Sequence, residues 1–297
     1  MDFMRRKIET PVPGRIGSYA ALYLAALDGE GRALATRYEV WRELCRLGEH
    51  LPDAEPGEIT TMDVERFLAV RCHARSLATR RKVLAVCSGF FTYLLDRDVV
   101  VKNPTRAIRR PNLPDPEPTW WTAEEVRAIL TAELQPRDRL LLITLARTGQ
   151  RVGVVRTLRW RDLSLDAKEP VISFRRGKGG RVFTFPIDKV LLREFILHRA
   201  LSNPAAESHV FRSRKGNALS PQQVNRVIEV ACRQAGVRVA SAHEFRRSAI
   251  TNLLHAGVPF DVVSRDVAGH ANPTTTMKHY RGTESARVRE AMRDLPY

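Results

Sequence analysis

The sequence predicts an α+β protein that is mainly helical, with one small β-hairpin or sheet in its second half. Apolar residues recur at helical spacing through most of the chain. Residues 171–174 and 182–185 instead alternate or are β-branched and aromatic, as strands are. A proline-rich stretch at residues 102–119 interrupts the helical pattern. Because 297 residues exceed the size of one small core, we expect two domains.

The charge of the chain indicates a polyanionic partner. The hydrophobic fraction of 43% is sufficient for folded cores, and the formal net charge is +16. Residues 1–118 hold 19 Lys and Arg against 16 Asp and Glu, and residues 119–297 hold the other 30 against 17. Nucleic acid is therefore the first expected partner and an acidic membrane surface the second, with the basic field mainly in the second half.

Several classes of protein are excluded by what the sequence lacks. It has no run of 18 apolar residues and no apolar signal core after its N-terminus, so we expect a cytoplasmic protein that does not enter membranes. The cysteines are scattered, without a C-x-x-C pair or a histidine at metal spacing, which indicates reduced thiols and no metal or other cofactor. They are Cys45, Cys72, Cys87 and Cys232.

The first half begins with an expected flexible arm at residues 1–15, where Pro11, Pro13 and Gly14 break regular structure. A helical domain follows at residues 16–101, and Thr61 with Asp63 resembles a helix start within it. Apolar periodicity predicts helices at about 17–28, 34–50, 61–73 and 76–97.

A basic segment lies between Arg66 and Lys82, with six basic residues and no acid. It is either a solvated helix face or a face that contacts a DNA backbone, and both interpretations stay open. The linker at 102–119 is also basic at its start. The candidate DNA-contacting residues in this half are Arg75, Arg80, Arg81, Lys82, Lys102, Arg109 and Arg110.

The second domain, residues 120–297, opens with a capping box, because Thr122 is followed three residues later by Glu125. Gly149 ends a leucine-rich helix, and Arg151 sits at the turn that follows. The strands at 171–174 and 182–185 are joined by RRGKGG, which places Lys178 at a hairpin tip. Helices are expected at about 136–148, 188–200, 221–235 and 284–295.

The stretch from Ser241 to Tyr280 carries the candidate chemistry. His243 and Arg246 are three residues apart within a helical pattern, so they project from one face of a helix that should end near Gly257. A short helical segment then leads to His270, and Tyr280 follows ten residues later among Lys and Arg side chains. Taken singly, each of these side chains is more often structural than catalytic.

Metal-dependent and nucleotide-binding motifs are incomplete. His243 begins an apparent H-E-x-x-H motif, but Arg247 occupies its last position, and RRGKGG lacks the spacing of a phosphate-binding loop. What remains is a set of guanidinium groups, an ammonium, two imidazoles and a phenol. Arginine suits the oxygens of a phosphodiester under attack, and a phenol can form a covalent bond to phosphorus, so a metal-free phosphoryl transfer is implied.

Five motifs in order, TGQRVGVVRTLRW, RRGKGGRVFTFPI, HEFRRS, AGH and KHY, resemble the tyrosine recombinase family, the phage-type integrases. The resemblance covers the whole chain and implies a helical core-binding domain, a basic linker and a catalytic domain. It assigns catalysis to Arg151, Lys178, His243, Arg246 and His270, with Tyr280 as the nucleophile. Arg175 and Arg247, within these motifs, are further candidate DNA contacts.

The resemblance also implies partners. The tyrosine would join a DNA 3′ phosphate and release a 5′ hydroxyl at double-stranded recombination sites. Four protomers would act on two duplexes, with the C-terminal helix packed against a neighbour. Accessory DNA-bending proteins would be further partners, and the cytoplasmic protein would associate with the nucleoid when bound to DNA.

Two positions depart from the family pattern. Val154 stands where the family usually has an acid, three residues after the first arginine, and Tyr280 follows His270 by ten residues, although nine is commoner. Apart from Tyr280, only the terminal Tyr297 competes as nucleophile. Two alternatives stay open: a DNA-binding protein of the same fold that has lost catalysis, and a nicking-closing enzyme similar to a type IB topoisomerase.

Overall fold

The structure is a computed structural model that describes residues 2–113, 119–176 and 181–268. The chain divides into two compact units, Met1–Asp115 and Pro116–Tyr297. Among the described residues, no helix has the length and apolar content needed to cross a lipid bilayer.

The first unit is helical. Its elements are α1 (Asp2–Ile8), α2 (Gly17–Gly29), α3 (Leu34–His50), α4 (Thr61–Arg71) and α5 (Leu77–Leu95). The four helices that periodicity predicts here are present, and α4 begins with a capping box in which Thr60, one residue before the expected start, pairs with Asp63. The core contains Leu44, Phe90 and Phe91, which are fully buried.

The expectation of a loose arm at residues 1–15 is wrong for its first part, because residues 2–8 form α1 and pack on α3. Trp41 Nε1 donates a hydrogen bond of 2.9 Å to the carbonyl of Thr10, and Val12 is buried. The proline breakers end this helix but do not prevent it, and contacts with α3 supply the stability that a seven-residue helix lacks alone.

The start of the predicted linker also belongs to the first unit. Asn103 Nδ2 donates to the carbonyl of Ser88 at 3.1 Å, and its Oδ1 accepts from the amide of Thr105 at 2.9 Å. Ile108 is buried in the same core as α5. These contacts could not be predicted from the proline-rich sequence of 102–119, because an Asx turn and one apolar residue leave no periodic pattern.

A buried carboxylate joins α3 to α4. Glu43 accepts hydrogen bonds from Arg71 at 2.8 and 2.9 Å and from Arg46 at 2.6 Å. Burial alone would raise the pKa of Glu43, but the hydrogen bonds from Arg71 and the surrounding guanidinium charges outweigh burial and lower it. Stability from this group is therefore present above its unfolded pKa and lost as the pH falls through the folded value.

We expect Glu43→Gln to lower the free energy of unfolding of the first unit by about 2–4 kcal/mol at neutral pH, because it leaves the partly buried Arg71 and Arg46 without their buried anion. The deficit relative to wild type should shrink on acidification below about 4.3, the ordinary glutamate pKa. Urea unfolding of the full chain measures both. Glu30→Gln, an exposed pair with Arg32, is the matched control and should cost almost nothing. A constant deficit at all pH values would contradict the linkage.

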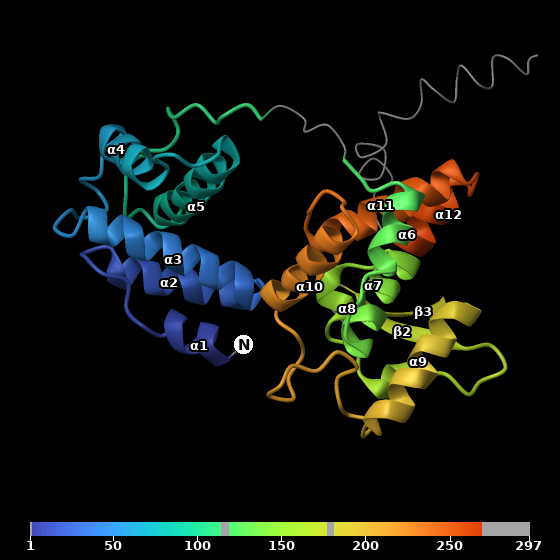
Figure 1. The fold of residues 1–297 in the computed structure, drawn as a ribbon. Coiled ribbons are helices and arrows are strands. Elements are labelled where there is room, and N and C mark those ends of the chain that lie inside the picture. Colours follow the sequence, from blue (N-terminus) through green and yellow to red (C-terminus); the bar gives the residue numbers. More distant parts are fainter. Residues whose placement is uncertain (1, 114–118, 177–180, 269–297) are drawn as a thin grey trace, which may run out of the picture. The chain divides into compact units, whose positions relative to one another are not determined.

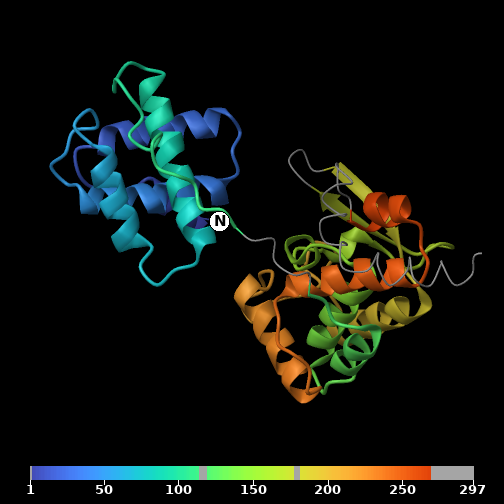
Figure 2. The same cartoon turned by 90° about the horizontal axis from the view of Figure 1, so that it is seen from above.

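The second unit packs helices around α7, with a small sheet at one edge (Figure 1 and Figure 2). Its helices are α6 (Ala123–Leu130), α7 (Pro136–Thr148), α8 (Val152–Val155), α9 (Lys189–Ser202), α10 (Pro221–Gln234), α11 (Ala242–His255), α12 (Phe260–Val262), the 3₁₀ turn η1 (Trp160–Asp162) and the π-helical η2 (Val263–Ala268). Six consecutive residues of α7 from Leu140 are buried, since α6, α9 and α11 contact it on different sides.

The sheet has the order β1-β2-β3 and is antiparallel throughout. The strands are β1 (Leu163–Ser164), β2 (Val171–Arg176) and β3 (Arg181–Pro186), and Phe174 pairs with Phe183 across the hairpin. The predicted hairpin is present, whereas β1 is too short to leave a sequence pattern. The capping box of Thr122 with Glu125 is present as predicted, and Ser220 with Gln223 forms a second one at the start of α10.

Candidate active site

The site is built on the turn that ends α7. Gly149 has a φ of +59°, and its carbonyl oxygen faces α11. A side chain there would place its Cβ 3.1 Å from Cβ of Ala249 on α11 and 3.1 Å from Cγ1 of Val267 in η2. Glycine is therefore needed twice, for the left-handed backbone and for the close approach of two other segments.

The next residue fastens this turn to η2. The side chain of Gln150 is buried, and its Nε2 donates to the carbonyl of Thr148 at 3.1 Å and to that of Val267 at 3.0 Å. The bond to Val267 holds η2 against the turn after α7, although 117 residues separate the bonded pair. Sequence reasoning did not single out Gln150.

Arg246 approaches the same turn from α11. Only 2% of its surface is exposed, and Nη1 donates a 3.0 Å hydrogen bond to the carbonyl oxygen of Gly149. This buried guanidinium thus binds the chain two residues before Arg151, although 97 residues separate the bonded pair. A buried cation of this kind is costly unless hydrogen bonds hold it in one place.

The helix that carries Arg246 is itself held firmly. Trp121 is fully buried, and its ring packs edge-on against Phe245 with centroids 4.9 Å apart. Its amide donates to Oγ of Ser248 at 2.8 Å, and its Nε1 donates to the carbonyl of Arg238 at 2.9 Å. Trp121, near the start of the second unit, therefore contacts α11 both before and after Arg246, at Phe245 and at Ser248.

Arg151 differs from Arg246 in its surroundings. It is the N-cap residue of α8, its carbonyl accepts from the amides of Val154 and Val155, and its side chain is exposed. Among the described residues, no group forms an ion pair or hydrogen bond with its guanidinium. The backbone is thus fixed while the side chain can reach an anion that comes from outside.

His243 lies in the first turn of α11 and is exposed, one turn before Arg246 as predicted. Lys178, His270 and Tyr280, together with the predicted helix at 284–295, lie outside the described residues. The structure therefore places Arg151, Arg246 and η2 at the turn that ends α7. The placement of Lys178, His270 and Tyr280 stays a prediction.

Val154 has an apolar setting in the structure. It is partly buried against the core of the second unit, so α8 presents a packing residue where an acid was expected. Glu244, buried on α11, pairs with Arg238 and lies 3.9 Å from Arg247. The candidate DNA contact Arg247 is thus partly buried and has a carboxylate nearby.

The other candidate DNA contacts are distributed over both units. Lys82 pairs with Glu39 at 2.7 Å, so its charge is already engaged within the first unit. The rest form no ion pair with any described residue, and their contact with DNA stays a prediction. They are Arg75, Arg80, Arg81, Lys102, Arg109, Arg110 and, on β2, Arg175.

Metal ligands do not gather in the described part of the chain, where no three His, Cys, Asp or Glu side chains are close enough to share an ion. All four cysteines are free, and Cys87 and Cys232 are buried. Burial raises the pKa of the Cys45 thiol to about 11, which leaves it protonated and unreactive at neutral pH.

We expect Gly149→Ala to lower the free energy of unfolding by about 2 kcal/mol, because alanine meets both a left-handed φ and two close carbon contacts. Gly257→Ala is the matched control, since Gly257 follows α11 at φ +88° with nothing near its added Cβ. It should cost only about 1 kcal/mol. Thermal unfolding measures both, and equal losses would show that α11 and η2 do not crowd the turn.

Comparison with known proteins points to one family. Residues 119–287 match the model of the phage integrase family. Tyrosine recombinase XerC of Xanthomonas axonopodis pv. citri is 30% identical over 261 residues, which cover 84% of each chain.

Two solved structures share the fold. A lambda integrase tetramer bound to a Holliday junction has a TM-score of 0.71 at 19% identity and matches 86% of this chain and 77% of its own. XerH site-specific recombinase bound to palindromic difH substrate, in a post-cleavage complex, has a TM-score of 0.69 at 21% identity and matches 97% and 94%. The chain therefore belongs to the tyrosine recombinase family of site-specific recombinases.

Proposed function

We propose that this recombinase cuts and rejoins duplex DNA at specific sites through a covalent bond between Tyr280 and a 3′ phosphate, without a metal ion. The observation that carries the proposal is the bond from buried Arg246 to the carbonyl of Gly149, two residues before exposed Arg151. This bond holds α11, which carries Arg246, against the turn that leads to Arg151. The family motifs supply the remaining groups.

In the proposed cleavage step, Oη of Tyr280 attacks phosphorus and the bond from phosphorus to the 5′ oxygen breaks. An imidazole, from His243 or His270, accepts the phenol proton, and Lys178 donates a proton to the departing 5′ oxygen. Arg151 and Arg246 bind the non-bridging oxygens, whose charge increases in the transition state. Rejoining is the same step in reverse, with a 5′ hydroxyl as nucleophile.

Strand exchange requires more than one protomer. The lambda integrase structure above is a tetramer on a Holliday junction, and the XerH structure is a post-cleavage complex. We propose that this chain likewise assembles on two duplexes, with a tetramer as the active form. Accessory DNA-bending proteins remain a prediction.

The experiment uses a nicked suicide duplex, from which the released segment diffuses away so that rejoining fails. Formation of a covalent protein–DNA adduct at the 3′ phosphate supports cleavage, whereas DNA binding without an adduct would favour the inactive DNA-binding alternative. Recombination between two sites, compared with relaxation of one plasmid, separates a recombinase from a nicking-closing enzyme. A chelator such as EDTA should leave adduct formation unchanged.

A further inference from the structure

The turn at residues 213–217 and the neighbouring helix α10 carry cations that have no carboxylate partner among the described residues. Some cations of the second unit have carboxylate partners: Arg147 pairs with Asp188 at 2.7 Å, and Arg161 pairs with Glu207 at 2.6 Å. In contrast, three side chains form no ion pair with any described residue. They are Arg214, Lys215 and Arg226.

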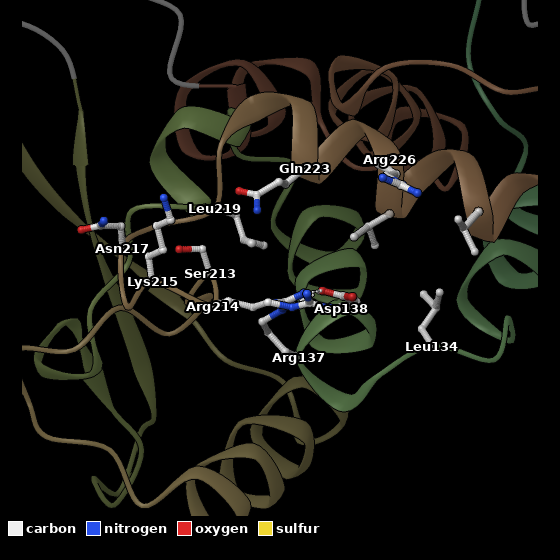
Figure 3. Close-up of a pocket in the computed structure, with 12 residues that line it drawn as sticks. Leu134, Arg137, Asp138, Ser213, Arg214, Lys215, Asn217, Leu219, Gln223 and Arg226 are labelled. Carbon is white, nitrogen blue, oxygen red and sulfur yellow. Dashed lines mark hydrogen bonds and ion pairs between the residues drawn. The ribbon is translucent and has the colours of Figure 1, made fainter. Parts of the chain in front are cut away.

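These three side chains line one open pocket of about 710 Å³ between the start of α7, the turn at 213–217 and α10 (Figure 3). Arg137 lines it as well, and the one carboxylate among the described lining residues, Asp138, is held by Arg137 at 2.6 Å. Figure 3 shows Arg137 and Arg214 extending toward the centre of the pocket. Four cations face one acid, so the pocket favours an anion.

Two helix starts add to the positive potential. The helices α7 and α10 begin at Pro136 and Pro221, and residues from the first turn of each line the pocket. Amide groups at helix starts carry partial positive charge and favour phosphate oxygens. The apolar lining offers little to a protein segment, because Leu219 is buried, Leu134 and Val227 are half-buried, and Val230 is the one exposed apolar side chain among the described lining residues, at 41%.

The turn is rigid enough to present its cations in a fixed place. The amide of Ser213 donates to the carbonyl of Asn217 at 2.7 Å, and that of Gly216 donates to the carbonyl of Ser213 at 2.9 Å. Gly216 has a φ of +80°, which allows the tight reversal, and the buried Phe211 anchors the approach. Arg214 and Lys215 therefore sit at the tip of an anchored hairpin turn.

A direct bond connects this turn to the candidate active site. Arg156, the C-cap residue just after α8, donates from Nη1 to the carbonyl of Leu219, two residues after the turn, at 3.0 Å. Arg151 begins the same helix, whose four residues span about 6 Å. A duplex carries a backbone charge about every 1.7 Å along its axis. DNA bound at Arg151 thus carries several further phosphates over the length of α8.

We propose that Arg214, Lys215 and Arg226 form a second phosphate-binding surface, which holds the backbone of the DNA beside the cleavage position. The inference rests on the proposed function, since it assumes that duplex DNA binds at Arg151. Contacts of this kind set the register and orientation of the protein on DNA and carry no base specificity.

The test is the salt dependence of binding of the full chain to a random-sequence duplex, followed by fluorescence anisotropy. The triple variant Arg214→Ala, Lys215→Ala, Arg226→Ala should reduce the slope of log affinity against log salt by about 0.9 for each phosphate that is no longer neutralised. The matched control removes three exposed cations that already have carboxylate partners, Arg193, Arg199 and Arg233. It should change the slope much less, and unchanged melting temperatures confirm that both triples fold.

Two results would overturn the inference. If the first triple keeps the wild-type slope, the pocket does not hold phosphates and an acidic protein segment becomes the better occupant. If both triples reduce the slope equally, only net charge matters. Failure of the proposed function is recognised separately, since it appears as wild-type protein that binds DNA but forms no covalent adduct on the suicide duplex.

Discussion

Tyr280→Phe is expected to abolish the covalent DNA adduct while leaving DNA affinity unchanged. Phenylalanine keeps the ring and removes only the oxygen that would bond to phosphorus, so cleavage stops at the bound complex. Labelled suicide duplex, resolved on a denaturing gel, measures the adduct, and anisotropy measures binding. Because the change removes the nucleophile itself, the loss should exceed that from any of the assisting side chains.

Tyr297→Phe is the matched control, because Tyr297 is the one other tyrosine after the H-x-x-R motif. It should form the adduct at the wild-type rate. If Tyr297→Phe loses the adduct and Tyr280→Phe retains it, Tyr297 is the nucleophile. Retention in both would refute a tyrosine nucleophile from this region altogether.

In the proposed step, cations at the site would let a phenol serve at neutral pH. Ionising a tyrosine with an ordinary pKa near 10 costs about 4 kcal/mol at pH 7. In the proposed step, an imidazole that takes the proton, together with guanidinium groups near the attacked phosphate, would offset most of this cost. The spacing of ten residues between His270 and Tyr280 places the phenol one residue later than is common in the family, which the adduct assay also tests.

Local patterns in the sequence predicted most of the helices, because their signals lie within a few residues. The caps at Thr122 and Ser220 and the αL residue Gly149 each need no more than one turn of chain. The family motifs added the candidate residues, of which Arg151, His243 and Arg246 fall in the described part. These parts of the molecule are specified by neighbours in sequence.

Contacts between distant residues were not predictable in the same way. The bonds from Gln150 to Val267 and from Arg246 to Gly149 join positions 117 and 97 residues apart, and neither leaves a periodic signal. The same holds for α1, which forms because α3 offers a surface for it. The basic turn at 213–217 was missed because its significance depends on which cations lack partners, and pairing is a property of the folded chain.

The two arginines of the site should respond differently to the same substitution. We expect Arg151→Ala to reduce the rate of adduct formation by about 10²–10³, the usual effect of removing one transition-state donor, with stability within about 0.5 kcal/mol of wild type. Its side chain is exposed and has no partner among the described residues. Rates of adduct formation and urea unfolding of the full chain separate the two effects.

Arg246→Ala should lose a similar factor in rate and also about 3 kcal/mol of stability. The change opens a cavity at a side chain that is 2% exposed and leaves the carbonyl of Gly149 without its donor. Arg246→Lys, measured below its melting temperature, keeps the charge and should recover part of the stability while losing the planar fork that suits phosphate oxygens. Equal stabilities for Arg151→Ala and Arg246→Ala would show that the bond to Gly149 does not hold the turn. A stable Arg246→Ala protein with wild-type cleavage would remove Arg246 from the proposed chemistry, because a guanidinium fixed beside Arg151 is then unnecessary for the step.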